Sequence, residues 1–163
     1  MSTQYEVGLA CDLQPNVPPL VLATLAAMVD ERSVPPAVLP DDPFFRDGDW
    51  QHLLRNGGTF PGLAGSTLQR AYRYHRPAAQ GGDPVFRYTL SCHVGCNDDV
   101  VANALFWFLR WLAPWSETVG CVGYYRAYLL QHVEPPTLVY FRGGRVLVLA
   151  VTGTPVDLAT GRP

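Results

Sequence analysis

Four stretches of the chain alternate apolar and polar residues, and this pattern constrains the fold more than any other feature of the sequence. Successive side chains of a strand point to opposite faces, so a period of two indicates a strand with one buried and one polar face. The clearest case alternates Phe86, Tyr88, Leu90, Cys92 and Val94 with Arg87, Thr89, Ser91 and His93. We predict strands over residues 5–13, 66–75, 86–94 and 119–129.

Two segments instead repeat their apolar residues at helical spacing. The first follows Pro18 and Pro19 and runs to Val29, which predicts a helix that ends before Pro35. The second begins after Asn97, a good N-cap, and is stopped by Pro114. We expect the stripe of Val101, Leu105, Phe108 and Leu112 to face the sheet, beside a second apolar stripe of Val100, Ala104, Trp107 and Trp111.

The order of these elements predicts the fold class. Strand, helix, strand, strand, helix and strand match an α+β, ferredoxin-like split βαβ sheet with two helices on one face. A C-terminal β-hairpin follows, with runs 138–141 and 146–151 joined around Gly143-Gly144. We predict one domain over residues 1–151 with an irregular insertion at 33–64, and a tail at 152–163. The insertion's Phe44, Phe45, Trp50 and Phe60 are expected to pack against the domain.

The composition excludes some functions. Lys and Ile are both absent, which is typical of a GC-rich bacterial coding sequence, and without Lys the chain can form neither a Schiff base nor a P-loop. The net charge of −2 gives no general attraction to nucleic acid or to anionic membranes. The N-terminus does not resemble a signal peptide, and the most apolar segment, residues 100–115, is too short to span a membrane. We therefore expect a cytoplasmic protein whose four cysteines are buried and reduced.

Two short motifs suggest metals, but their spacing does not fit. In Cys92-His93-x-x-Cys96 the first two residues would point to opposite faces of a strand, and no second Cys/His pair completes a zinc site. Asp47-Gly48-Asp49 lacks the alternating oxygen ligands and the terminal Glu of a calcium loop. We predict no metal and no cofactor.

The sheet face turned away from the helices is the strongest candidate for a site. Alternation assigns to it a set of candidate ligand-binding residues, together with Glu6 and Asp12: Arg73, His75, Arg87, His93, Tyr124, Arg126 and Tyr128. Arginines suit carboxylate or phosphate, and tyrosines can stack on a ring, so this face could hold an anionic or aromatic ligand. A solvated face, or the interface of a homodimer, would explain the same residues.

Two functional hypotheses follow. The first is a non-enzymatic ligand-binding or protein-interaction domain that self-associates as a homodimer, with Trp107 and Trp111 as interface candidates because the second helix carries a surplus apolar stripe. The second is a small enzyme that acts on an anionic or aromatic metabolite at the open face, with His75 or His93 as acid-base group. No motif identifies catalytic residues, a substrate or a pathway.

Overall fold

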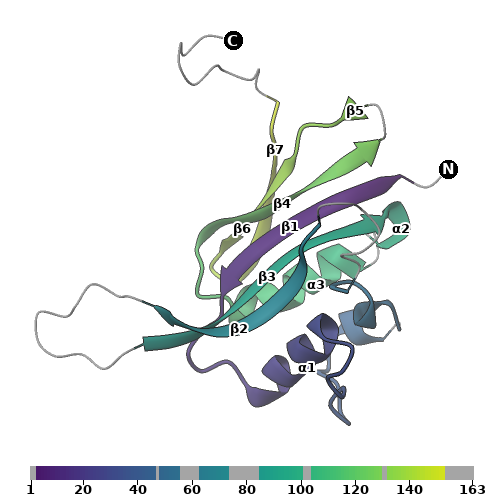
Figure 1. Ribbon diagram of the computed structural model, residues 1–163. Helices are drawn as coiled ribbons and strands as arrows, with labels where there is room; N and C mark the ends of the chain where they lie inside the picture. Colours follow the sequence, from purple (N-terminus) through teal and green to yellow (C-terminus); the bar gives the residue numbers. More distant parts are fainter. Residues whose placement is uncertain are drawn as a thin grey trace, which may run out of the picture.

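The protein is an α+β fold built on one antiparallel sheet (Figure 1). The computed structural model describes residues 3–46, 48–55, 63–73, 85–100, 104–129 and 132–152. Six strands follow one another across the sheet in the order β2-β3-β1-β4-β6-β7, and the short β5 pairs with β4. The strands are β1 (Gln4–Asp12), β2 (Gly65–Arg73), β3 (Val85–Asn97), β4 (Gly120–Leu129), β5 (His132–Val133), β6 (Thr137–Arg142) and β7 (Arg145–Ala150).

The helices cover one face of this sheet (Figure 1). They are α1 (Pro19–Val29), α2 (Asp98–Val100) and α3 (Phe106–Leu112), with 3-10 turns η1 (Pro43–Phe45), η2 (Gly48–Gln51) and η4 (Ala113–Trp115). Asn97 Oδ1 accepts the Val100 N–H at 2.9 Å, which confirms the predicted helix cap. The second helix was predicted to run from its cap to about Ala113. Its described residues are helical over 98–100 and 104–112, and Val101 lies outside the described residues.

The core lies between the sheet and the helices. Leu90, Phe108 and Leu112 are fully buried there, as the predicted stripes require. The insertion contributes as well, because Phe44 and Phe45 of η1 are buried against α3. Trp50 is also buried, whereas Phe60 lies outside the described residues. The insertion therefore packs into the core against α1 and α3, as its aromatic content predicted.

The alternation predicted for β4 is wrong at its start. It assigned Cys121 to the apolar side and Val122 to the open face, but Val122 is 3% exposed and Cys121 is exposed. The pairing of β4 with β6 shifts between Cys121 and Gly123, so one extra residue reverses the phase of the strand. Gly123 permits this arrangement because a Cβ there would stand 2.0 Å from the Gly8 carbonyl oxygen of β1.

The predicted C-terminal hairpin is confirmed. Gly143 and Gly144 have φ angles of 58° and 70°, the positive values that a two-residue type I′ turn requires. The hairpin ends the sheet at β7, which pairs with β6 alone among the strands that the structure describes. In the described part of the chain, no helix has both the length and the apolar character needed to cross a membrane.

Candidate functional site

A polar cluster occupies the centre of the open sheet face. Its middle is Glu6 on β1, which lies opposite Arg126 of β4 in the sheet register. Two residues along β1, Gly8 lies opposite His93 on β3 and Tyr124 on β4. Directly opposite residues of neighbouring strands share a face, so the three flanking side chains converge on Glu6.

The Glu6 carboxylate is surrounded by donors. Tyr124 Oη donates to Oε1 at 2.5 Å, and His93 Nε2 lies 2.8 Å from the same oxygen. The Arg126 guanidinium binds Oε2 through Nε at 2.7 Å and Nη2 at 2.6 Å. Because Glu6 is only 7% exposed, this carboxylate is enclosed and its oxygens are occupied by the protein's own side chains.

Gly8 makes room for the cluster. A Cβ on Gly8 would lie 2.7 Å from Cε1 of the Tyr124 ring, so that ring crosses β1 where a side chain is missing. This position allows the Tyr124 hydroxyl to reach Glu6 from two residues away along the strand. Gly8 thus leaves the space in which the Tyr124 ring packs, a role that sequence alternation alone could not identify.

The surroundings of Glu6 and Tyr124 fix the protonation state of each near neutral pH. Burial by itself would raise the pKa of Glu6, but the hydrogen bonds from Tyr124, His93 and Arg126 outweigh it and lower this pKa from 4.5 to about 2. Burial and the hydrogen bond to Glu6 raise the pKa of Tyr124. Near neutral pH, Glu6 is therefore ionised and Tyr124 protonated. The arrangement fixes side chains across three strands and leaves these two groups poorly suited to exchange protons with a ligand.

The three arginines expected to converge do not form one anion site in the described residues. Arg87 forms an ion pair with Glu117, which raises its pKa. Arg126 lies opposite Glu6, and Glu6 lies opposite Gly95 on β3. Gly95 is eight residues along β3 from Arg87. At about 3.3 Å per residue, the backbone positions of the two arginines are therefore roughly 25 Å apart along the strands. Each is paired with a carboxylate of the chain itself.

Part of the predicted set is not described. His75 lies outside the described residues, and the side chains of Arg73 and Tyr128 are likewise not described. Of the predicted ligand-binding residues, His93, Tyr124 and Arg126 are brought together, and Arg87 stands apart.

The two interface candidates on α3 differ in exposure. Trp107 is 39% exposed, and the Arg110 guanidinium lies 4.8 Å from the centre of its ring. Trp111 is 6% exposed, packed edge-to-face with Phe45 and stacked on Phe44. The insertion covers most of Trp111 within the chain itself, so of the two only Trp107 is exposed enough to contact a partner protein.

The cysteine motif is divided between the two faces. Cys92 and Cys96 are buried on the helix side, where burial raises the pKa of each to about 12, while His93 points to the open face. Within the described ranges, no group of three or more His, Cys, Asp or Glu side chains could hold a metal ion.

The residues that sequence reasoning missed lie on β7. Its apolar run predicted only the second strand of the hairpin, and in the structure Leu147, Val148 and Leu149 are each about half exposed. Alternation did place Glu6 on the open face, but nothing in the sequence signalled that its carboxylate would bind the side chains around it on that face.

Comparisons with protein-family models, with curated proteins and with solved structures find no match to this chain.

Proposed function

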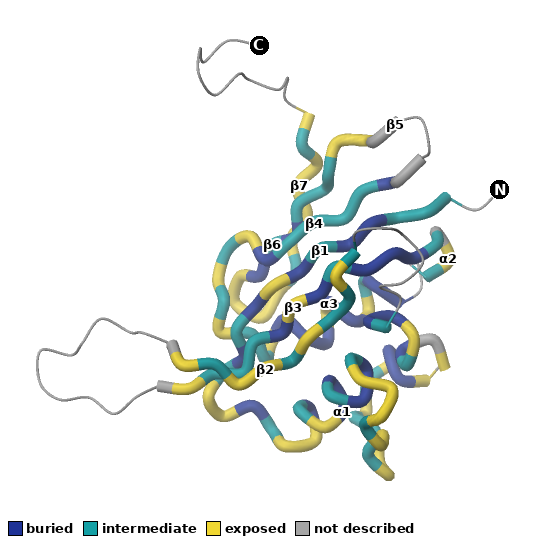
Figure 2. The backbone as a smooth tube through the Cα atoms, viewed as in Figure 1, coloured by how far each residue is buried: buried dark blue, intermediate teal, exposed yellow. Residues whose placement is uncertain are grey.

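We propose that this chain is a non-enzymatic binding domain that self-associates, and that a second copy pairs with it along the edge of β7. One observation carries the proposal: Leu147, Val148 and Leu149 are 49%, 53% and 55% exposed on a strand that ends the sheet. Figure 2 shows β7 as largely exposed. An exposed, apolar edge strand has unpaired main-chain groups and is a template for another strand.

The other edge of the sheet is more polar. Among the described side chains of β2, the exposed ones are Thr67, Gln69 and Arg70 beside a single large apolar side chain, Tyr72, and charged or polar side chains on an edge discourage pairing. Selective pairing at β7 is therefore favoured over pairing at β2.

The main-chain geometry of β7 suits a second copy in antiparallel orientation. The Val151 N–H donates to the Pro136 carbonyl, so the odd-numbered residues of β7 turn their N–H groups towards β6. Val146, Val148 and Ala150 then present theirs outward. A two-fold axis at Val148 places Leu147 of each copy against Leu149 of the other, so the apolar side chains meet in pairs.

The charges at the ends of β7 also fit this arrangement. Arg145 would lie opposite Val151 of the second copy, which keeps the two Arg145 residues at opposite ends of the paired strands. Val151 pairs with Pro136 within the chain, and the exposed Glu134 stands two residues before Pro136. Glu134 therefore lies at the end of β7 where Arg145 of the second copy would be placed. Opposite charges therefore lie at the same end of the proposed interface, on either side of β7.

The rival function, a small enzyme for an anionic metabolite at the open face, has less support. It needs arginines available to a ligand, whereas Arg87 and Arg126 are each paired with a carboxylate of the chain. His93, its described acid-base candidate, is held by Glu6.

We also infer a ferredoxin-like plan for the part of the fold before the C-terminal hairpin. Support comes from the antiparallel order β2-β3-β1-β4, with α1 between β1 and β2 in the chain and α2 and α3 between β3 and β4.

Sedimentation velocity over a range of concentrations from the low micromolar upward tests the proposed self-association. We expect a monomer–dimer equilibrium for the native chain and a shift to monomer for Val148→Lys, because a charge on the edge opposes pairing. Val119→Lys is the matched control, since Val119 is 76% exposed outside the sheet edge, and it should leave the equilibrium unchanged. A native chain that stays monomeric throughout, or a dimer indifferent to Val148→Lys, would overturn the proposal.

A further inference from the structure

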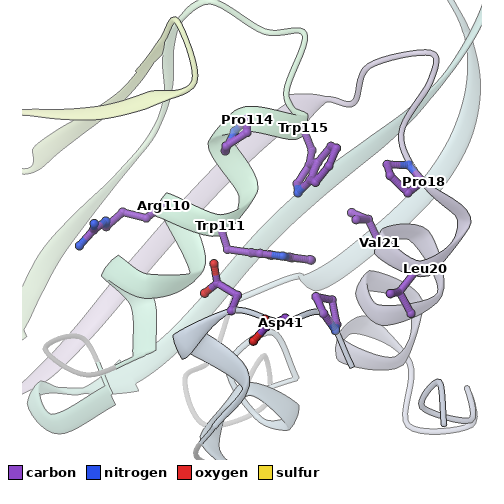
Figure 3. Close-up of a pocket in the computed structure, with 10 residues that line it drawn as sticks. Pro18, Leu20, Val21, Asp41, Arg110, Trp111, Pro114 and Trp115 are labelled. Carbon is purple, nitrogen blue, oxygen red and sulfur yellow. The ribbon is translucent and has the colours of Figure 1, made fainter. Parts of the chain in front are cut away.

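A pocket of about 410 Å³ lies in the helical layer, apart from the open sheet face (Figure 3). Its walls come from the start of α1, from residues 40–42 of the insertion, and from the end of α3 with η4. The lining includes Pro18, Val21, Asp41, Asp42, Trp111 and Trp115. Three segments far apart in the sequence thus meet around two indole rings and two carboxylates.

The indole rings of the pocket are held in place by their surroundings. Trp111 is stacked on Phe44 with ring centres 6.2 Å apart, and Phe45 meets it edge-to-face at 5.0 Å. Trp115 belongs to η4 and packs against the core while remaining half-buried. Rings already fixed in this way lose little conformational entropy when a ligand binds. Their faces carry negative electrostatic potential, which attracts cations.

The charges around the pocket favour the same kind of ligand. Asp41 is exposed, and Asp42 is positioned by the hydrogen bond that its Oδ1 accepts from the Phe44 N–H at 2.9 Å. The start of α1 contributes only about half a positive charge, less than the two carboxylates carry. Arg110 also lines the pocket, but its guanidinium lies over Trp107, and Figure 3 shows it directed away from Trp111 and Trp115. The pocket is therefore net acidic.

We propose that this pocket binds the alkylated ammonium group of a small organic cation. The indole faces attract the positive charge, the carboxylates balance it, and Pro18 and Val21 supply apolar surface for the alkyl substituents. A bare metal ion would need a shell of oxygen ligands that Asp41 and Asp42 cannot supply alone. The volume is at the lower end of the range for small-molecule sites, which fits a compact head group. This site is independent of β7 and of self-association.

Choline and its uncharged carbon isostere 3,3-dimethylbutan-1-ol are the probes for a direct test. The two share size and shape and differ in charge, so isothermal titration calorimetry separates cation recognition from burial of apolar surface. We expect choline to bind to the full chain and the isostere to bind about tenfold more weakly, the size of a desolvated cation–π interaction. Equal binding of the two, or no binding of choline at millimolar concentration, would overturn the proposal.

Matched variants locate the binding site. Trp115→Leu removes a ring and Asp41→Asn removes a charge, and each should weaken choline binding several-fold, because each deletes one part of the attraction. Glu31→Gln, which removes a carboxylate charge outside the pocket, should bind choline as the native chain does. Circular dichroism checks that each variant is folded; if Trp115→Leu is not, Asp41→Asn decides. Binding that is unchanged in the folded pocket variants would place choline elsewhere and reject the pocket.

Discussion

The two faces of the central strands β1 and β3 are built from alternate residues of the same segments, yet different forces hold them. On the helix side, Leu9, Leu90 and Val94 are all at most 4% exposed among apolar neighbours. On the open side, Glu6 and His93 form part of a network of charged and hydrogen-bonded groups. One face is stabilised by removing apolar surface from water, the other by satisfying an enclosed carboxylate.

Because different forces hold the two faces, each face responds to a different kind of change. The helix-side face responds to changes in volume and hardly at all to pH, because it holds few ionisable groups apart from thiols whose pKa burial raises to about 12. The open face responds to charge, because Glu6 joins three strands through Tyr124, His93 and Arg126. A face that looks like a binding surface in the sequence is thus, at its centre, part of the protein's own framework.

The largest expected effect comes from making a cavity on the helix side. Leu90 is 0% exposed, and Leu90→Ala should lower the free energy of unfolding by about 2–5 kcal/mol, through lost burial and the cavity left behind. Ser91→Ala is the control, because Ser91 is exposed on the open side of the same strand and its loss should change stability by less than about 0.5 kcal/mol. Urea denaturation measures both. Similar losses for the two variants would contradict the assignment of faces.

A smaller loss is expected when the open-face cluster loses its charge. Glu6→Gln places an amide among three donors and leaves Arg126 without its counter-ion, so the free energy of unfolding should fall on the order of 2 kcal/mol at pH 7. Glu31→Gln, which removes the same charge from an exposed position after α1, should have little effect. Equal stability of Glu6→Gln and the native chain would mean that the cluster does not hold the strands together.

The same carboxylate predicts how stability depends on pH. The pKa of Glu6 is lowered from 4.5 to about 2 on folding, so its contribution is fully present above pH 4.5. It is lost as the pH falls from 4.5 towards 2, because the unfolded chain then binds a proton that the folded chain does not. The difference in unfolding free energy between the native chain and Glu6→Gln should therefore shrink over this interval in urea titrations. A difference that is constant from pH 6 to pH 3 would contradict this lowered pKa.

Local patterns predicted the regular elements well, because alternation and capping act over a few residues. The strand through Leu90, the cap at Asn97 and the turn at Gly143-Gly144 all follow from neighbours in the sequence. The packing of Phe44 and Phe45 was also foreseeable, because aromatic side chains in a polar insertion need a buried place.

The site was less predictable, because it depends on pairing between distant segments. Alternation assigns Glu6 and Arg126 to one face, but whether they face each other depends on the β1–β4 register, 120 residues apart in the chain. The exposure of Val148 depends on where the sheet ends, which an apolar run cannot reveal. The bulge at Val122 leaves no local signal except Gly123, which allows the close approach of β1.

The smallest expected effect on stability, and the sharpest check on where the two faces exchange, comes from labelling the cysteines. Cys121 is exposed because the bulge reverses the phase of β4, whereas Cys11, Cys92 and Cys96 are buried with pKa values raised to about 12 by burial. Ellman's reagent should therefore modify one thiol rapidly in the folded chain and all four after denaturation. Cys121→Ser should remove the rapid phase with little change in unfolding free energy. A rapid phase that survives this substitution would show that a cysteine assigned to the buried face reaches solvent, and the boundary between the faces would have to be redrawn.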